Sequence, residues 1–340
     1  MNNLSFKNIF LFLLLIAGGW KLGAQDVHYT QMYATPLYIN PAFTGNHECD
    51  YRAGVNYREQ DASFTIPFVT YTAWGDTRFS PRFLNQRGWI GVGAHMYYDN
   101  AGHGDLTKVQ AMLLTSYNQG FNYDNSLYGS LGIGLGITNR SININNLIFG
   151  DQWDSLNYVF GFGTQEPILL ENSSIFYPDF NLGVSVHHLV NENWMYEIGG
   201  SISHINTPKE SFYGTSNNRV GRKYIAHATV QYILSSRFLI KPELYFVAHE
   251  GVQETILGAN TVFNVIELKL HGGLWHRLGR DIMPVVGLEY NRFTVLFSYD
   301  INVSNQRVAT NYKGGFEVSL TKQFCARHST KRRPCKFLSF

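Results

Sequence analysis

Between Tyr51 and Phe324 the chain alternates apolar residues with small or polar ones, in short tracts separated by loops and turns. In the last tract Phe316 and Val318 fall on one parity and Glu317 falls on the other. A period of two indicates β-strands whose two faces differ. In a soluble sheet the apolar face covers a core. In an outer-membrane barrel it faces lipid, and the polar face lines the lumen.

The alternating tracts predict the strands directly. They span residues 51–58, 68–76, 88–98, 107–118, 127–138, 179–188, 196–205, 223–234, 239–248, 254–263, 267–275, 282–290, 293–300 and 313–324. Many of them have about 9–11 residues, the length that a tilted strand needs to cross a bilayer.

The predicted connections between these tracts fall into two length groups. Short ones follow even-numbered strands, at residues 235–237, 264–266 and 291–292, and long ones follow odd-numbered strands, at residues 139–178, 206–222 and 301–312. Barrels of the outer membrane have short periplasmic turns and long surface loops, whereas a soluble β-sandwich, the alternative, gives no reason for this separation. Residues 77–87 form a longer connection than this rule expects. We therefore predict an all-β protein, a closed antiparallel transmembrane β-barrel of about fourteen strands with periplasmic termini.

The composition supports this choice. Only 15% of the 340 residues are charged, whereas soluble domains average about 25%. Glycine (32 residues), tyrosine (21) and phenylalanine (24) are abundant, as in barrels with tight strands and aromatic girdles. The net charge of +2 gives no indication of a nucleic-acid partner.

The chain divides into four predicted segments. An apolar run from Ile9 to Trp20 follows Lys7 and ends near Ala24, which is typical of a secretory signal peptide; the run is short for the alternative, a membrane anchor. We therefore predict a signal peptide at 1–24, a periplasmic or lumenal N-terminal segment at 25–50, the barrel at 51–324 and a basic periplasmic tail at 325–340. The tail is either solvated or in contact with anionic headgroups.

Three cysteines allow one geometric hypothesis. In a closed barrel the first and last strands are antiparallel neighbours, so Cys49 and Cys325 should both lie at the periplasmic rim near the seam. The hypothesis is that Cys49 bonds Cys325 or Cys335 and staples the closure, which requires Cα atoms within about 7 Å of each other. A local bridge between Cys325 and Cys335, or three free thiols, remain alternatives.

No motif points to catalysis, a cofactor or a metal. The glycines of residues 132–136 alternate within a strand and no helix follows them, so they are interpreted as small lumen-facing residues and not as a phosphate-binding loop. The pair His187-His188 lacks the spacing of a zinc protease, and no Gly-x-Ser-x-Gly pattern is present. We predict a non-enzymatic protein without cofactor.

Several segments resemble the PorP/SprF family of Bacteroidota outer-membrane proteins, which belongs to the type IX secretion and gliding machinery. The segments that carry the resemblance are residues 25–45, 176–184, 203–212, 227–229, 258–260, 298–304 and 314–320, with a basic end at 331–335. Within the first of them, Asn40, Pro41 and Gly45 form the N-terminal family motif. The resemblance implies a fourteen-stranded barrel, integral to the outer membrane after signal-peptide cleavage.

The same resemblance implies the function and the partners. Family members receive the C-terminal sorting domain of a secreted surface protein after it leaves the translocon, and they support its secretion or its anchoring on the cell surface. The expected partners are that sorting domain, the type IX translocon with its periplasmic components, and outer-membrane lipid. An outer-membrane transport porin for small or hydrophobic solutes is the alternative.

Two segments are candidates for contact with these partners. The longest predicted surface loop mixes apolar side chains with asparagines, so it either folds into the barrel mouth or offers a docking surface. The candidate partner-binding residues are Ile148, Phe149, Trp153, Phe160, Phe212 and Tyr213. Residues 25–45 are polar and aromatic, and they can plug the lumen, contact periplasmic partners or form a flexible lead-in.

Overall fold

The computed structural model describes residues 27–47, 49–62, 66–81, 84, 87–102, 104–122, 124–154, 159–160, 164, 173–212 and 217–325. The predicted signal peptide, the tail beyond Cys325 with Cys335, and the candidate residue Tyr213 lie outside this part of the chain.

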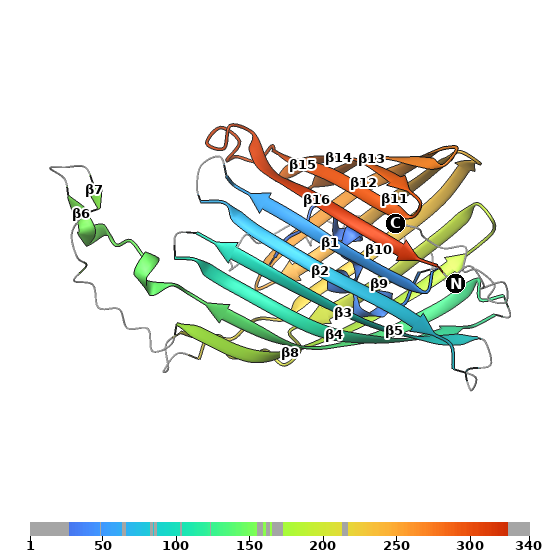
Figure 1. The fold of residues 1–340 in the computed structure, drawn as a ribbon, viewed down its shortest axis with the longest axis horizontal. Coiled ribbons are helices and arrows are strands. Elements are labelled where there is room, and N and C mark those ends of the chain that lie inside the picture. The colour runs from blue at the N-terminus through green and yellow to red at the C-terminus, as the bar shows by residue number, and fades with distance from the viewer. Residues whose placement is uncertain are drawn as a thin grey trace, which may run out of the picture.

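Fourteen strands of the described chain form one closed antiparallel barrel, in which β1 pairs with both β2 and β16 (Figure 1). The barrel strands are β1 (Tyr51–Gln60), β2 (Phe68–Phe79), β3 (Gly88–Ala101), β4 (Leu106–Gly120), β5 (Leu127–Ser141), β8 (Ser174–Leu189), β9 (Trp194–Ser203), β10 (Lys223–Ser235), β11 (Phe238–His249), β12 (Val252–Val265), β13 (Leu268–Arg277), β14 (Asp281–Tyr290), β15 (Phe293–Asn302) and β16 (Lys313–Phe324). The predicted fold class is confirmed. Within these same residues, no helix has the length and apolar character needed to cross a membrane.

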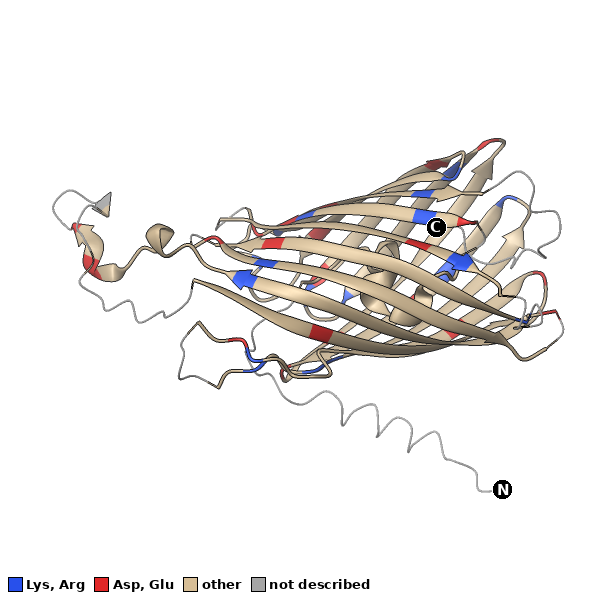
Figure 2. Ribbon diagram, turned by 60° about the horizontal axis from the view of Figure 1, so that its bottom comes forward, with Lys and Arg blue, Asp and Glu red and all other residues tan. Residues whose placement is uncertain are grey.

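The alternation in the sequence separates the two faces of the barrel wall. On β5 the side chains of Leu135 and Ile137 are 55% and 62% exposed on the outside, whereas Thr138 is fully buried inside. Charged residues occupy few positions along the strands (Figure 2). The wall therefore presents an apolar outer surface and, over much of its inner surface, polar side chains.

The two ends of the barrel differ in their connections. At one end, which we call the disulfide rim, β1 begins and β16 ends, and the turns are residues 80–87, 121–126, 190–193, 236–237, 266–267 and 291–292. At the opposite end, the loop rim, the connections include residues 142–173, 204–222 and 303–312. The three longest connections all lie at the loop rim, as the sequence predicts, while the connection 80–87 at the disulfide rim remains longer than the rule expects.

The longest connection contains regular structure that the alternation did not predict. Strands β5 and β8 continue beyond their predicted ends, and they still pair with each other at Ser141 and Ser174. Beyond them lie η4 (Ile144–Asn146), η5 (Gly150–Gln152) and a small hairpin of β6 (Trp153–Asp154) and β7 (Val159–Phe160). We call residues 142–173 the excursion, and Figure 1 shows its described part, with β6 and β7, projecting away from the barrel. Two-residue strands are too short to produce a recognisable period.

The N-terminal segment fills the inside of the barrel, where Figures 1 and 2 both show its short helices. Residues 27–47, which we call the plug, contain η1 (Met32–Ala34), α2 (Pro36–Ile39) and η2 (Pro41–Phe43). Both Pro36 and Pro41 stand at the first position of their helix, where the missing N–H costs no hydrogen bond. Of the three roles considered for this segment, the lumenal one matches its position.

Candidate functional site

Three wall glycines form a seat for the turn at Asn40–Gly45. A Cβ atom on Gly132 of β5 would lie within 3 Å of the Pro41 carbonyl carbon and the Ala42 nitrogen. A Cβ on Gly91 of β3 would lie equally close to the carbonyl oxygen of Thr44. Another on Gly183 of β8 would collide with the side chain of Asn40. Only glycine lets the plug backbone approach the wall this closely, so these positions hold the plug by shape.

Asn40 organises the turn from both sides. Its Oδ1 accepts a hydrogen bond from the Ala42 N–H at 2.9 Å and so caps η2. Its Nδ2 lies 3.1 Å from the Val184 carbonyl oxygen and 3.3 Å from that of Gly200, both in the wall. The family-motif residue Asn40 therefore joins the local fold of the plug to strands β8 and β9.

Two histidines and one glutamate recognise the plug asparagines. The carboxylate of Glu197, on β9, lies 2.8 Å from Nδ1 of His187 and 3.5 Å from Nδ1 of His227. The Nε2 atoms of these rings lie 2.9 Å from Asn46 Nδ2 and 3.0 Å from Asn40 Nδ2, respectively. Since an amide Nδ2 only donates, the Nε2 atom of each ring is the acceptor in these two contacts.

Gly45 completes the turn near the disulfide rim. Its φ of +66° favours glycine, and its N–H donates to Asp76 Oδ2 at 2.8 Å. The same carboxylate pairs with Arg52 at 2.9 Å and lies 3.7 Å from Nε2 of His47. Burial, assisted by Arg52, lowers the pKa of His47 to about 4, so this ring is neutral at pH 7.

A buried charge cluster holds the other half of the plug. The guanidinium of Arg58 lies 2.7 Å from Asp300 Oδ2 and 3.3 Å from Glu317 Oε2. Thr30 of the plug hydrogen-bonds to both carboxylates: its N–H donates to Glu317 at 2.7 Å and its hydroxyl donates to Asp300 at 2.6 Å. Gln31 adds a bond from Nε2 to the Glu317 carbonyl oxygen at 3.0 Å. Charges buried this deeply are tolerated only when they are paired in this way.

An apolar patch of the wall packs against the rest of the plug. Tyr33 stacks on Trp275 with ring centroids 5.3 Å apart, and Leu37 packs among Trp74 and its neighbours. The described residues leave cavities of about 60 Å³ and about 20 Å³ between plug and wall. Sites for drug-sized ligands have about 300–1,000 Å³. Neither of these two cavities has room for a solute of that size.

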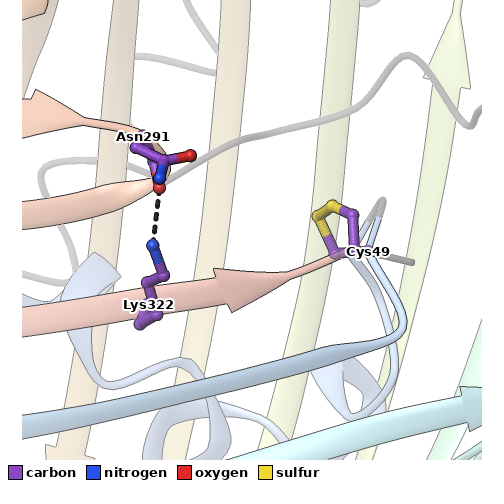
Figure 3. The surroundings of a disulfide bond; sticks show 4 residues. Cys49, Asn291 and Lys322 are labelled. Carbon is purple, nitrogen blue, oxygen red and sulfur yellow. Dashed lines mark hydrogen bonds between the residues drawn. A yellow bond between two sulfur atoms is a disulfide. The ribbon is translucent and has the colours of Figure 1, made fainter. Parts of the chain in front are cut away.

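The cysteine next to the plug is bonded across the barrel seam. Cys49 forms a disulfide with Cys325, and their Cα atoms lie 4.4 Å apart (Figure 3). Close by, Lys322 donates from Nζ to the carbonyl oxygen of Asn291 at 2.6 Å, which ties β16 to the turn before β15 (Figure 3). The disulfide fixes the carboxyl end of the plug at the disulfide rim.

The candidate partner-binding residues do not all gather in one place. Trp153 and Phe160 pair across β6 and β7 with ring centroids 4.9 Å apart, and they are 42% and 56% exposed. Ile148 of the same excursion is exposed, whereas Phe149 is half-buried. Phe212 is half-buried in the separate loop 204–222.

That separate loop is tied down on the wall. Glu210 accepts from the hydroxyl of Tyr177 at 2.6 Å and pairs with Arg140. The excursion, by contrast, is tied to the barrel near its base, where Asn146 donates to Asp105 at 2.6 Å. Its outer part therefore offers exposed aromatic surface away from the wall.

Sequence reasoning missed the wall residues that hold the plug. Gly91, Gly183 and Arg58 received no role, and Gly132 was expected only to leave room. A usable signal existed, because charged residues on the lumenal parity need partners, and the N-terminal segment is rich in amides and hydroxyls. Within the described ranges, no group of three or more His, Cys, Asp or Glu side chains is arranged to hold a metal ion.

Solved structures share the barrel architecture. The crystal structure of the Ralstonia pickettii toluene transporter TbuX has a TM-score of 0.52 and 9% identity, covering 86% of this chain and 94% of that chain. The structure of a Pseudomonas aeruginosa FadL homologue has a TM-score of 0.50 and 9% identity, covering 84% of this chain and 93% of that one. At such identities the likeness concerns the fold alone.

The sequence itself matches one family model. The model describes the type IX secretion system membrane protein PorP/SprF, and it matches residues 22–321. No curated protein matches the sequence.

Proposed function

Because this chain belongs to the PorP/SprF family of type IX secretion system membrane proteins, we propose that it receives the sorting domain of a secreted surface protein at its loop rim. Family and fold identify an integral outer-membrane protein associated with type IX secretion. By the usual topology of such barrels, the short turns of the disulfide rim lie in the periplasm and the loop rim faces outward. The proposed role is non-enzymatic docking that supports secretion or surface anchoring.

One observation carries the docking proposal. The excursion presents Trp153 and Phe160, whose exposed rings touch with their planes tilted by 59°, beyond the barrel and on its outward side (Figure 1). Aromatic side chains at exposed, protruding positions are common anchors of protein interfaces. The plug inside the barrel (Figure 1) supports a docking role over a conduit, and the two cavities described above are too small for a drug-sized solute.

The experiment replaces both aromatic residues with serine. We expect Trp153→Ser with Phe160→Ser to reduce surface display of the secreted protein that depends on this barrel, identified by comparing surface proteomes with and without the gene. The matched control is Leu278→Ser with Val308→Ser, which removes two exposed apolar side chains from other loop-rim connections. Heat-modifiable migration in gels verifies an intact barrel. Equal display in both variants, with folded barrels, would refute the docking role of the excursion.

The second candidate is transport of small or hydrophobic solutes. Its support is the fold shared with a structure titled as a toluene transporter and with a FadL homologue. Conductance and solute uptake in planar bilayers and liposomes distinguish the candidates. We expect the native protein to show neither conductance nor solute uptake. Steady uptake by protein with its plug in place would favour the transporter.

A further inference from the structure

The plug crosses the lumen from one rim to the other. Its carboxyl end is fixed at the disulfide rim, where Gly45 donates to Asp76 and Cys49 is bonded to Cys325. Its middle rests on the wall glycines. Its amino end contacts residues that stand at the opposite ends of their strands.

Three contacts trace this path toward the loop rim. Thr30 bonds Asp300, which lies two residues before the end of β15. The Tyr29 carbonyl oxygen accepts from Arg277, the last residue of β13, at 3.4 Å. Both strands end at the loop rim, so successively earlier residues of the plug lie successively further outward.

The amino end is held at the mouth by a second set of polar contacts. His28 Nδ1 lies 3.0 Å from Glu254 Oε2, near the start of β12, and the other Glu254 oxygen is 3.2 Å from Arg280. The Tyr38 hydroxyl donates to the carbonyl oxygen of Val27 at 2.8 Å. The side chain of His28 keeps 18% of its surface exposed, so water reaches this end.

We infer that the plug is threaded through its own barrel, and that the chain preceding Val27 opens at the cell-surface mouth. With cleavage after Ala24, only Gln25 and Asp26 precede Val27, and two residues span at most about 7 Å. The mature amino terminus then lies on the outward face, beside the loops. A partner that binds this face can grip the amino end and pull on the plug. The inference depends on barrel orientation and not on cargo docking.

Peptide tags test the inference in intact cells. A tag for covalent capture is inserted before Val27, after Val308 as the outward control, or after Ile266 as the periplasmic control. A fluorescent capture protein too large to cross the outer membrane is then added. We expect the first two tags to be labelled in intact cells and the third only after permeabilisation.

Each alternative result overturns the inference. Labelling before Val27 only after permeabilisation, with Val308 labelled in intact cells, means that the plug does not reach the surface. Failure at Val308 together with labelling at Ile266 means that the barrel has the opposite orientation. The first result leaves the docking proposal intact, whereas the second would contradict that proposal too, because the excursion would then face the periplasm.

Single cysteines provide a second readout in case a tag prevents folding. His28→Cys places a thiol at the partly exposed end of the plug, and Thr35→Cys places one where the side chain is fully buried. With the Cys49–Cys325 disulfide intact, a membrane-impermeant polymer maleimide should shift His28→Cys by one adduct in intact cells. It should leave Thr35→Cys and the native chain unshifted. An unshifted His28→Cys in a folded barrel contradicts the threaded path.

Discussion

Substituting one wall glycine should unseat the plug while leaving the barrel strands intact. Gly132→Ala adds a methyl group that would lie within 3 Å of the backbone of Pro41 and Ala42. Backbone atoms cannot rotate away as a flexible side chain can, and carbon atoms pack at about 3.5–4.0 Å. The nearest contacts would be 2.2 Å, so the turn must retreat from β5 by more than about 1 Å.

The free-energy cost of this retreat is the sum of steric overpacking and of the hydrogen bonds that the turn loses. Overpacking costs about 1–3 kcal/mol by itself. Asn40 Nδ2 would also lose the bonds that its two N–H groups share among Val184, Gly200 and His227 at 3.0–3.3 Å, with a net value of about 1 kcal/mol for each N–H group. We therefore expect the seat to be weakened by about 3–5 kcal/mol.

Gly134→Ala is the matched control, because it lies on the same face of the same strand. Its Cβ would meet the Asn181 Cβ and the flexible Met112 Cε, both at 3.3 Å, and no plug atom is among its nearest neighbours. Small shifts accommodate this contact, and the lower entropy of the unfolded chain offsets part of the cost. The control should behave like the native protein.

Hydrogen exchange in detergent micelles measures the effect. Amides of residues 29–46 should exchange faster in Gly132→Ala than in Gly134→Ala, while the amides of β4 and β5 remain protected. Gly91→Ala, which opposes Thr44 from β3, should reproduce the result. Native-like protection of the plug in Gly132→Ala would refute the argument that these glycines form its seat.

Three further predictions concern the groups around the plug. Arg58→Met should destabilise the folded barrel by about 3–5 kcal/mol, since it leaves buried carboxylates without their cation. Adding Glu317→Gln should recover part of this loss, measured as the thermal unfolding midpoint in heat-modifiability gels. An unchanged midpoint in Arg58→Met would contradict the role of the charge cluster. The lowered pKa of His47 means that its contribution to stability is complete above about pH 6.5 and is lost as the pH falls toward about 4, on the order of 3 kcal/mol. His47→Asn should therefore show a shallower loss of plug protection on acidification, and an unchanged slope argues against this histidine. Reduction of the disulfide should lower the thermal midpoint of the native chain by the equivalent of about 2–5 kcal/mol. The same reductant should leave the midpoint of the Cys49→Ser, Cys325→Ser double variant unchanged. Equal midpoints of the native chain with and without reductant would show that the disulfide does not stabilise the barrel.

The strands were predictable because their signal is local. Every second residue of β16 reports which face it occupies, and the predicted bounds 313–324 coincide with the observed strand Lys313–Phe324. Connection lengths then gave the two rims without any knowledge of the contacts. The seam followed from closure alone, which places Cys49 opposite the end of β16.

The seat of the plug was not predictable from local patterns. Thr30 bonds Glu317 across 287 positions, and Asn40 meets His227 across 187. Such pairings depend on how the tilted wall brings distant strands around one short segment. The small helices add no period that could indicate which side faces which strand. Sequence therefore indicated a polar segment and a polar lumen, and only the assembled barrel specifies their register.

The balance of forces separates what positions the plug from what retains it. Without the plug, water would enter the lumen and hydrate Arg58 and Glu317, so each lost hydrogen bond has a net value of only about 0.5–1.5 kcal/mol. The side chains of Met32, Tyr33, Leu37 and Ile39 are buried against the wall, and burying one such side chain contributes about 1.5–3 kcal/mol. One apolar contact therefore offsets two or three polar ones. The polar network selects a single register of the plug, because a plug shifted along the barrel would move its hydrogen-bonding groups away from the charged wall residues that they contact. The apolar contacts supply most of the retention, so a force that releases the plug must overcome hydrophobic burial, which salt does not screen.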